Sequence, residues 1–169
     1  MPSIPFSGIS APQALGCSLC KSPVVKYHSS TNGVKAWGMP FFPMSNPRED
    51  LLTRQIIGCA IEVHRELGPG LLESSYEETL CHEFERVAIG YGRQLILPLH
   101  YKGQSLDCGY RIDLIVEDQV IVEIKAVEKT LPIHDAQLMT YLRLANKKTG
   151  LLINFNVCQL REGVRRLSL

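Results

Sequence analysis

Several patterns are missing from this 169-residue sequence, and each absence argues against a class of protein. No run of about 18 apolar residues occurs, so a membrane-spanning helix is not expected. The N-terminus lacks a charged start followed by an apolar core, so we expect no secretory leader and a cytoplasmic location. A formal net charge of only +1 gives no strong overall attraction to nucleic acid or to a membrane.

The six cysteines form neither a disulfide framework nor a complete zinc motif. Four of them fall in segments with helix or strand periodicity, mostly among apolar neighbours, which indicates reduced, buried thiols. Cys17 and Cys20 form a C-x-x-C pair, but no second ligand pair stands at zinc-finger spacing. A zinc protein is therefore the last of the functions that we consider.

Residues 1–46 differ in composition from the rest of the chain. They hold six of the ten prolines, three lysines and no Asp or Glu, and they show no helical or strand periodicity. This composition predicts a poorly structured N-terminal extension. The remaining residues, 47–169, carry 15 basic side chains (18 less those three) and 17 acidic ones, and we expect them to form one domain with a net charge of −2.

Apolar periodicity in residues 47–169 predicts the order α-α-β-β-β-α-β. The expected helices run from about Asp50 to Leu67, Leu72 to Val87 and His134 to Asn146, and the expected strands are 95–101, 110–116, 120–126 and 150–155. A run of strands with helices at both ends indicates a mixed α/β sheet. Pro98 predicts that the first strand lies at a sheet edge or carries a bulge.

Charged residues interrupt the second and third expected strands. If residues 117–119 form a three-residue loop, the pair numbers across this hairpin sum to 236, so Asp113 lies opposite Glu123 on the same face. Lys125 shares that face because side chains repeat every two residues along a strand. A two-residue loop would instead separate the carboxylates.

Two facing carboxylates repel each other, and the repulsion grows with burial. A bound cation, a shared proton or full exposure to solvent would relieve it. Hard divalent ions such as Mg²⁺ and Mn²⁺ prefer oxygen ligands, which fits a paired Asp and Glu. A solvated sheet face with a salt bridge to Lys125 explains these residue types equally well.

Asp113 followed by Glu123-Ile124-Lys125 resembles the D-x(n)-E-x-K core of the PD-(D/E)XK superfamily, and Gly70-Leu71-Leu72-Glu73-Ser74-Ser75-Tyr76 resembles the signature of the GxxExxY protein family. The flanking segments agree with that family over about residues 50–169: Ile61-Glu62-Val63-His64, Leu67-Gly68-Pro69-Gly70, Tyr110-Arg111-Ile112-Asp113-Leu114, His134-Asp135-Ala136-Gln137-Leu138 and Leu152-Ile153-Asn154-Phe155.

The resemblance implies a restriction-endonuclease-like αβββαβ core preceded by an extra helix. It also implies that Asp113 and Glu123 bind Mg²⁺ with help from the Ile124 carbonyl, that Lys125 positions the attacking water, and that Gln137 lines the site. Glu73 would add an acidic group and a further metal ligand from the preceding helix. From the residues alone, Glu73 is a first-turn carboxylate favoured by the helix dipole.

We therefore expect a Mg²⁺- or Mn²⁺-dependent phosphodiester hydrolase that acts on nucleic acid, with DNA favoured over RNA. The alternative is a non-catalytic module of the same fold that binds nucleic acid or protein. A homodimer or a protein partner also remains open. Phosphate contacts are expected from the basic residues near the C-terminus, which are Lys147, Lys148, Arg161, Arg165 and Arg166.

Overall fold

The computed structural model describes residues 47–169; the expected extension (1–46) and the Cys17–Cys20 pair lie outside them. The helices are α1 (Pro47–Leu67), α2 (Glu73–Arg86), α3 (Pro132–Leu144) and α4 (Leu160–Gly163), and the strands are β1 (Tyr91–Tyr101), β2 (Gln104–Val116), β3 (Val120–Lys125), β4 (Thr149–Asn154) and β5 (Val164–Ser168). The predicted mixed α/β class and the order of its first seven elements are confirmed. No helix in this part of the chain is long and apolar enough to span a membrane.

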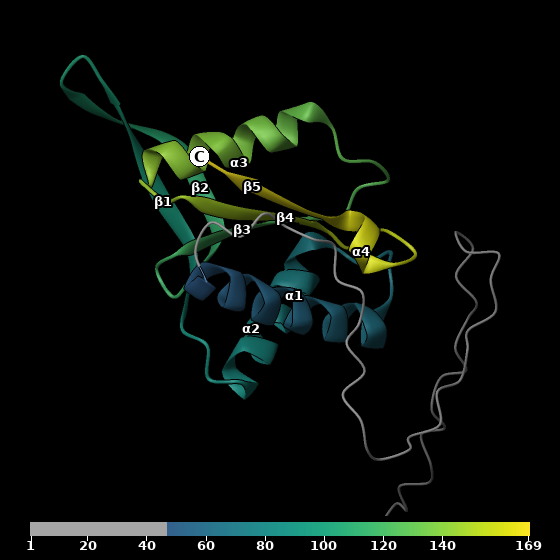
Figure 1. The fold of residues 1–169 in the computed structure, drawn as a ribbon. Helices are drawn as coiled ribbons and strands as arrows, with labels where there is room; N and C mark the ends of the chain where they lie inside the picture. Colours follow the sequence, from purple (N-terminus) through teal and green to yellow (C-terminus); the bar gives the residue numbers. More distant parts are fainter. Residues whose placement is uncertain (1–46) are drawn as a thin grey trace, which may run out of the picture.

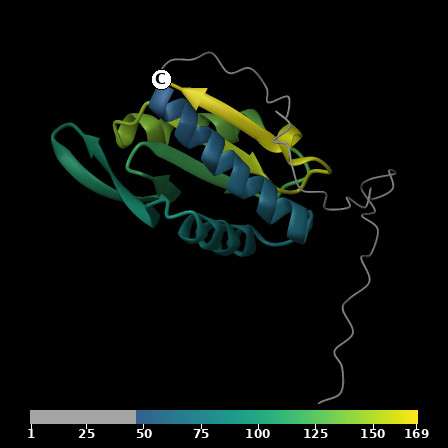
Figure 2. The same cartoon turned by 60° about the horizontal axis from the view of Figure 1, so that its bottom comes forward.

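The five strands form one sheet in the order β1-β2-β3-β4-β5. The β3–β4 pair is parallel and the other three pairs are antiparallel. Helices α1 and α2 cover one face of the sheet and α3 covers the other, which gives three layers (Figures 1 and 2). Each face accordingly has its own cluster of buried side chains, the larger under α1 and α2 and the smaller under α3.

The hairpin between β2 and β3 has the predicted register. Leu114 pairs with Val122, and Val116 pairs with Val120 across the three-residue loop 117–119. The pair numbers sum to 236, as expected. The ladder of paired residues between these strands ends at the Leu114–Val122 pair. Asp113 and Glu123 are therefore the first residues beyond it, where β2 leaves β3.

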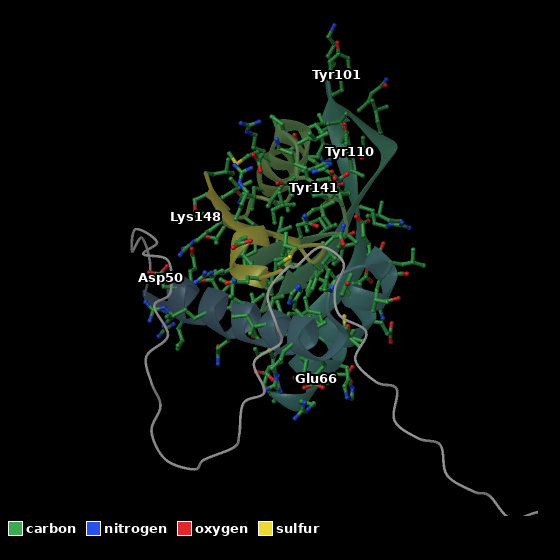
Figure 3. All side chains as sticks on the ribbon, turned by 90° about the vertical axis from the view of Figure 1, so that its right-hand side faces the viewer. Asp50, Glu66, Tyr101, Tyr110, Tyr141 and Lys148 are labelled. Atoms are coloured by element: carbon green, nitrogen blue, oxygen red, sulfur yellow. The ribbon has the colours of Figure 1, made fainter. Side chains whose placement is uncertain are left out.

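Beyond that point β2 pairs only with β1, and residues 95–112 form a two-stranded β arm. The arm projects from the body of the protein (Figure 1), and Figure 3 shows Tyr101 near its far end. Lys102 and Gly103, both with positive φ, make its two-residue turn, a conformation that suits a tight hairpin. The register shifts between Leu97 and Leu99, so Pro98 lies at a bulge in an edge strand, as predicted.

Tyr76 joins α2 to the core. Its ring is fully buried and stacks on Phe155 at a centroid distance of 4.4 Å. Its hydroxyl donates a hydrogen bond to the Gly68 carbonyl at 2.7 Å and accepts one from the Leu71 amide. This contact fixes the Gly-Pro-Gly link between α1 and α2. Tyr76 is therefore a core residue whose polar tip is hydrogen-bonded.

Several boundaries differ from the expectations. The C-terminal elements α4 and β5 were not predicted, and β2 begins six residues earlier than expected. Leu72 and Val87, the two ends of the apolar stripe expected along the second helix, are exposed. Cys59 and Cys81 are free and buried as expected, whereas Cys158 is disulfide-bonded, against the expectation.

Candidate active site

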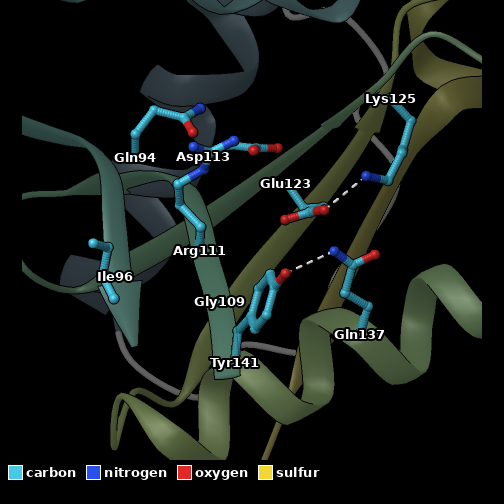
Figure 4. Close-up of a pocket in the computed structure, with 9 residues that line it drawn as sticks. All are labelled: Gln94, Ile96, Gly109, Arg111, Asp113, Glu123, Lys125, Gln137 and Tyr141. Atoms are coloured by element: carbon cyan, nitrogen blue, oxygen red, sulfur yellow. Dashed lines mark hydrogen bonds and ion pairs between the residues drawn. The ribbon is translucent and has the colours of Figure 1, made fainter. Parts of the chain in front are cut away.

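A cleft of about 570 Å³ opens where β2 diverges from β3. The β arm forms one wall, β3 contributes the floor and α3 forms the opposite wall (Figure 4). The residues that line it are Gln94, Ile96, Gly109, Arg111, Asp113, Glu123, Lys125, Gln137 and Tyr141. Four of the five residues predicted to be catalytic therefore share one cleft, and only Glu73 is missing from its lining.

Asp113 bridges the gap between the diverging strands. Its Oδ2 atom accepts a hydrogen bond from the backbone N–H of Ile124 at 2.9 Å. The side chain thus satisfies an amide just beyond the end of the backbone ladder. This contact fixes the Asp113 carboxylate beside the residue that follows Glu123.

Glu123 is a buried carboxylate with one oxygen paired and one left over. The residue is 1% exposed, and its Oε1 atom accepts a 2.7 Å hydrogen bond from Lys125 Nζ within an ion pair. Its Oε2 atom is buried and has no hydrogen-bond partner among the described residues. An unpartnered buried carboxylate oxygen is unfavourable in a folded protein and often marks a site that another group fills.

The electrostatics of the site follow from this burial. Loss of hydration and the neighbouring Asp113 charge raise the pKa of Glu123 to about 7, and the attraction of Lys125 only partly opposes them. Burial also raises the pKa of Asp113, against the hydrogen bond from Ile124. Burial alone would lower the pKa of Lys125, but the hydrogen bond and charge of Glu123 outweigh it, so this pKa is raised.

Helix α3 presents an amide and a phenol to the same cleft. Gln137 Nε2 donates a 2.7 Å hydrogen bond to Tyr141 Oη, and these residues lie one turn apart (Figure 4). The Tyr141 ring also meets Tyr110 of the β arm edge-on at 6.3 Å. His134 lies three residues before Gln137, but its side chain caps the start of α3, where its Nδ1 atom accepts a hydrogen bond from the Leu131 backbone N–H.

Glu73 lies at the start of α2, as expected for a first-turn carboxylate. Its Oε1 atom accepts a hydrogen bond from the backbone N–H of Ala126 at 3.1 Å, directly after Lys125. The contact holds α2 against the end of β3. A role of Glu73 as a metal ligand stays a prediction.

The chemistry of the donor set suits a hard divalent cation. Asp113 and Glu123 present carboxylate oxygens to one cleft, and Glu123 Oε2 is available. No cluster of three or more His, Cys, Asp or Glu side chains suited to a metal occurs within residues 47–169. The side-chain ligands would therefore be these two carboxylates, and the Ile124 carbonyl stays a predicted third.

A family model described as the PD-(D/E)XK nuclease superfamily matches residues 50–167. The match spans nearly all of the described domain, including every element that lines the cleft. The chain belongs to the PD-(D/E)XK nuclease superfamily. Its mixed α/β architecture is accordingly that of a restriction-endonuclease-like fold, as predicted.

No curated protein and no solved structure matches the chain. The D…E-x-K residues of the PD-(D/E)XK pattern are Asp113, Glu123 and Lys125, and the structure brings all three into one cleft. The narrower resemblance to the GxxExxY family stays a prediction.

The basic residues expected to contact phosphate do not line this cleft. Arg166 forms a buried ion pair with Asp50, and Arg165 pairs with Asp135 at 2.8 Å. Lys147 pairs with Asp118 at 2.7 Å. Sequence position alone could not reveal these partners, because each lies at least 29 residues away in the chain.

Two polar residues of the cleft were missed. Gln94 lies in β1, and its side-chain amide donates a hydrogen bond to buried Glu77 of α2. Arg111 lies two residues before Asp113 in β2, so strand alternation places both on one face, but Arg111 was not among the predicted site residues.

Proposed function

We propose that this protein is a divalent-metal-dependent nuclease that hydrolyses phosphodiester bonds in DNA or RNA. The observation that carries the proposal is the buried Oε2 atom of Glu123, which lacks a hydrogen-bond partner among the described residues and belongs to a side chain that lines the same cleft as Asp113. Membership of a nuclease superfamily supports the same reaction class. DNA is favoured over RNA as the substrate.

Asp113 and Glu123 would hold Mg²⁺ or Mn²⁺. When bound, such an ion supplies Lewis-acid polarisation of the scissile phosphate and a water of lowered pKa. The carboxylates are already held in place for this task, Asp113 by the Ile124 amide and Glu123 by Lys125. Little reorganisation of these side chains is needed on binding.

Lys125 would orient the attacking water and stabilise negative charge at the phosphate. Its ammonium group has three donors, and the described contacts use one of them for Glu123. The ion pair keeps Lys125 protonated, because it raises the Lys125 pKa above the ordinary value despite burial. Gln137 would donate to a phosphate oxygen from the α3 wall, with Tyr141 fixing its amide.

The test is cleavage of plasmid, linear and single-stranded DNA and of RNA by the full chain, with Mg²⁺ or Mn²⁺ and with chelator. Lys125→Ala should lower the rate by about 10²-fold or more, a usual loss for a group that assists proton transfer. Lys129→Ala is the matched control, because Lys129 is exposed and lies outside the cleft. It should cleave like the unsubstituted protein.

Equal cleavage by Lys125→Ala and the unsubstituted protein would assign the activity to a contaminant. Absence of cleavage, together with no heat of Mg²⁺ or Mn²⁺ binding, would refute the nuclease and leave the non-catalytic binding module.

A further inference from the structure

Arg111 is the exposed cation of the cleft. The charged residues in the lining are Arg111, Asp113, Glu123 and Lys125. Lys125 is paired with Glu123, whereas the side chain of Arg111 makes no hydrogen bond or ion pair with any of the described residues. A cationic side chain at a cleft wall without a protein partner is available to an anionic ligand.

Lys125 and Arg111 lie on neighbouring strands and differ in whether a nearby carboxylate pairs with them. In β3, Glu123 and Lys125 stand two residues apart and form an ion pair. In β2, Arg111 and Asp113 have the same spacing but do not pair, and Asp113 instead accepts the Ile124 amide. Asp113 is thus held by the backbone, and Arg111 remains free in the cleft.

Ile96 lies directly across from Arg111 on the β arm. The two residues are register partners between β1 and β2, and both line the cleft. Ile96 is 67% exposed, although a large apolar side chain in a strand is usually turned into a core. A cation and an apolar surface side by side match the two halves of a nucleotide, the phosphate and the sugar or base.

The negative charge of the domain favours such a contact. Residues 47–169 carry a net charge of −2, and two carboxylates sit at the floor of the cleft. A polyanionic strand that enters this cleft meets repulsion unless a cation on the wall offsets it. Three of the five C-terminal basic residues are already used in ion pairs elsewhere, which leaves Arg111 in the cleft for this task.

We infer that Arg111 and Ile96 form a nucleotide-binding pair on the β arm. Arg111 contacts a backbone phosphate that flanks the scissile one, and Ile96 contacts the sugar or base attached to it. This inference rests on the proposed nuclease function and names the part of the protein that holds the substrate strand. Both residues are positioning residues, because neither is assigned to the reacting atoms.

The test measures binding separately from cleavage. The full chain carrying Lys125→Ala is titrated with a short fluorescent DNA or RNA oligonucleotide in the presence of Mg²⁺, and anisotropy gives Kd at several salt concentrations. Each lost phosphate contact should lower the slope of log Kd against log salt by about 0.7 for a single strand and about 0.9 for a duplex.

Arg111→Gln should weaken binding by about tenfold or more, as expected for loss of a charge-assisted hydrogen bond, and should lower the salt slope by one contact. Ile96→Thr keeps a β-branched side chain and should weaken binding a few-fold without changing the slope, because no charge is removed. Arg54→Gln, at an exposed arginine of α1 on the opposite face of the sheet, should change neither.

Thermal unfolding of the Arg111→Gln protein should match that of the parent, because the side chain is exposed and unpaired. If the parent binds the oligonucleotide and Arg111→Gln binds with the same Kd and salt slope, the inference is wrong and the nuclease proposal stands. If neither this parent nor the unsubstituted protein binds nucleic acid, both the inference and the proposed function are overturned.

Discussion

The buried carboxylate of Glu123 should make the protein less stable without metal, and Glu123→Gln should therefore stabilise it. The reason is that the folded state raises the pKa of this group to about 7 from an ordinary value of 4.5. A group with a raised folded-state pKa contributes stability below its unfolded pKa, and that stability is lost as the pH rises through the folded pKa. The loss for Glu123 therefore falls between pH 4.5 and pH 7.

The size of the effect follows from the rise of the Glu123 pKa from 4.5 to about 7, because each tenfold change in proton affinity corresponds to about 1.4 kcal/mol. Linkage then gives a penalty of roughly 1 kcal/mol at about pH 5 and about 3 kcal/mol at about pH 8. Glutamine has nearly the same shape and no charge, and its carbonyl still accepts a hydrogen bond from Lys125. Loss of the attraction to Lys125 offsets part of the gain, so we expect Glu123→Gln to be more stable by about 1–3 kcal/mol at about pH 8.

The assay is urea unfolding at both pH values in chelator, which compares the free energies of unfolding of the two proteins. Glu162→Gln is the control, because it removes a carboxylate that is exposed in α4 and should show no comparable pH-dependent gain. A stability difference for Glu123→Gln that is the same at both pH values, or a loss of stability at about pH 8, would refute the reasoning. Either result would mean that Lys125 fully compensates the Glu123 charge.

Added Mg²⁺ should reverse the order of stability, so that the unsubstituted protein becomes more stable than Glu123→Gln. Binding to the folded state alone stabilises it by about 2.7 kcal/mol when the free ion is at 100 times its Kd. The unsubstituted protein should gain stability in this way, and Glu123→Gln should gain little. The same substitution should abolish cleavage, so that stability and function change in opposite directions.

Three further predictions follow from the same contacts. By calorimetry, the apparent Kd for Mg²⁺ should fall about tenfold per pH unit as the pH rises toward 7 and then level off, because Glu123 must lose its proton to bind the ion. Tyr76→Phe should lower the free energy of unfolding by about 1–3 kcal/mol, since it leaves the buried hydrogen bond to Gly68 unmade, while cleavage per folded molecule stays the same. Gly163→Ala should lower it by about 3 kcal/mol or more, because the added Cβ would lie 2.1 Å from the Asn154 carbonyl oxygen, and unchanged thermal unfolding would contradict this.

Local patterns predicted most of the sheet because they specify it physically. The two-residue repeat of strand side chains and the three-residue loop before β3 determine which residues face each other, and the observed Val116–Val120 pairing agrees. Pro98 cannot donate a ladder hydrogen bond, so its edge position and bulge were also predictable. The convergence of Asp113 with Glu123 followed from the same register.

Features that depend on contacts between residues far apart in the chain could not be predicted from local sequence patterns. The segment of β5 contains two adjacent arginines and no clean apolar alternation, and only its pairing with β4 makes it a strand. Arg166 was expected to bind phosphate, yet it is buried against Asp50, 116 residues away in the chain. The length of β2 was underestimated because its outer half pairs only with β1 and its described side chains are mostly exposed. The apolar alternation that predicts a strand is therefore weak there.

The position of the cleft has a structural cause that links the fold to the chemistry. A continuous β2–β3 ladder would pair the Ile124 amide with a backbone carbonyl and keep the two strands together. Instead the ladder stops one residue short, the Asp113 side chain takes the amide, and β2 leaves to form the β arm. The Asp113 carboxylate therefore links β2 to β3 at the end of their ladder and also lies at the point where the cleft begins. Asp113→Asn should separate these roles, because its side-chain oxygen can still accept the Ile124 amide while the charge that would bind a cation is gone. Retained cooperative unfolding with lost Mg²⁺ binding is the expected result, and loss of the fold would show that the charge itself holds the strands.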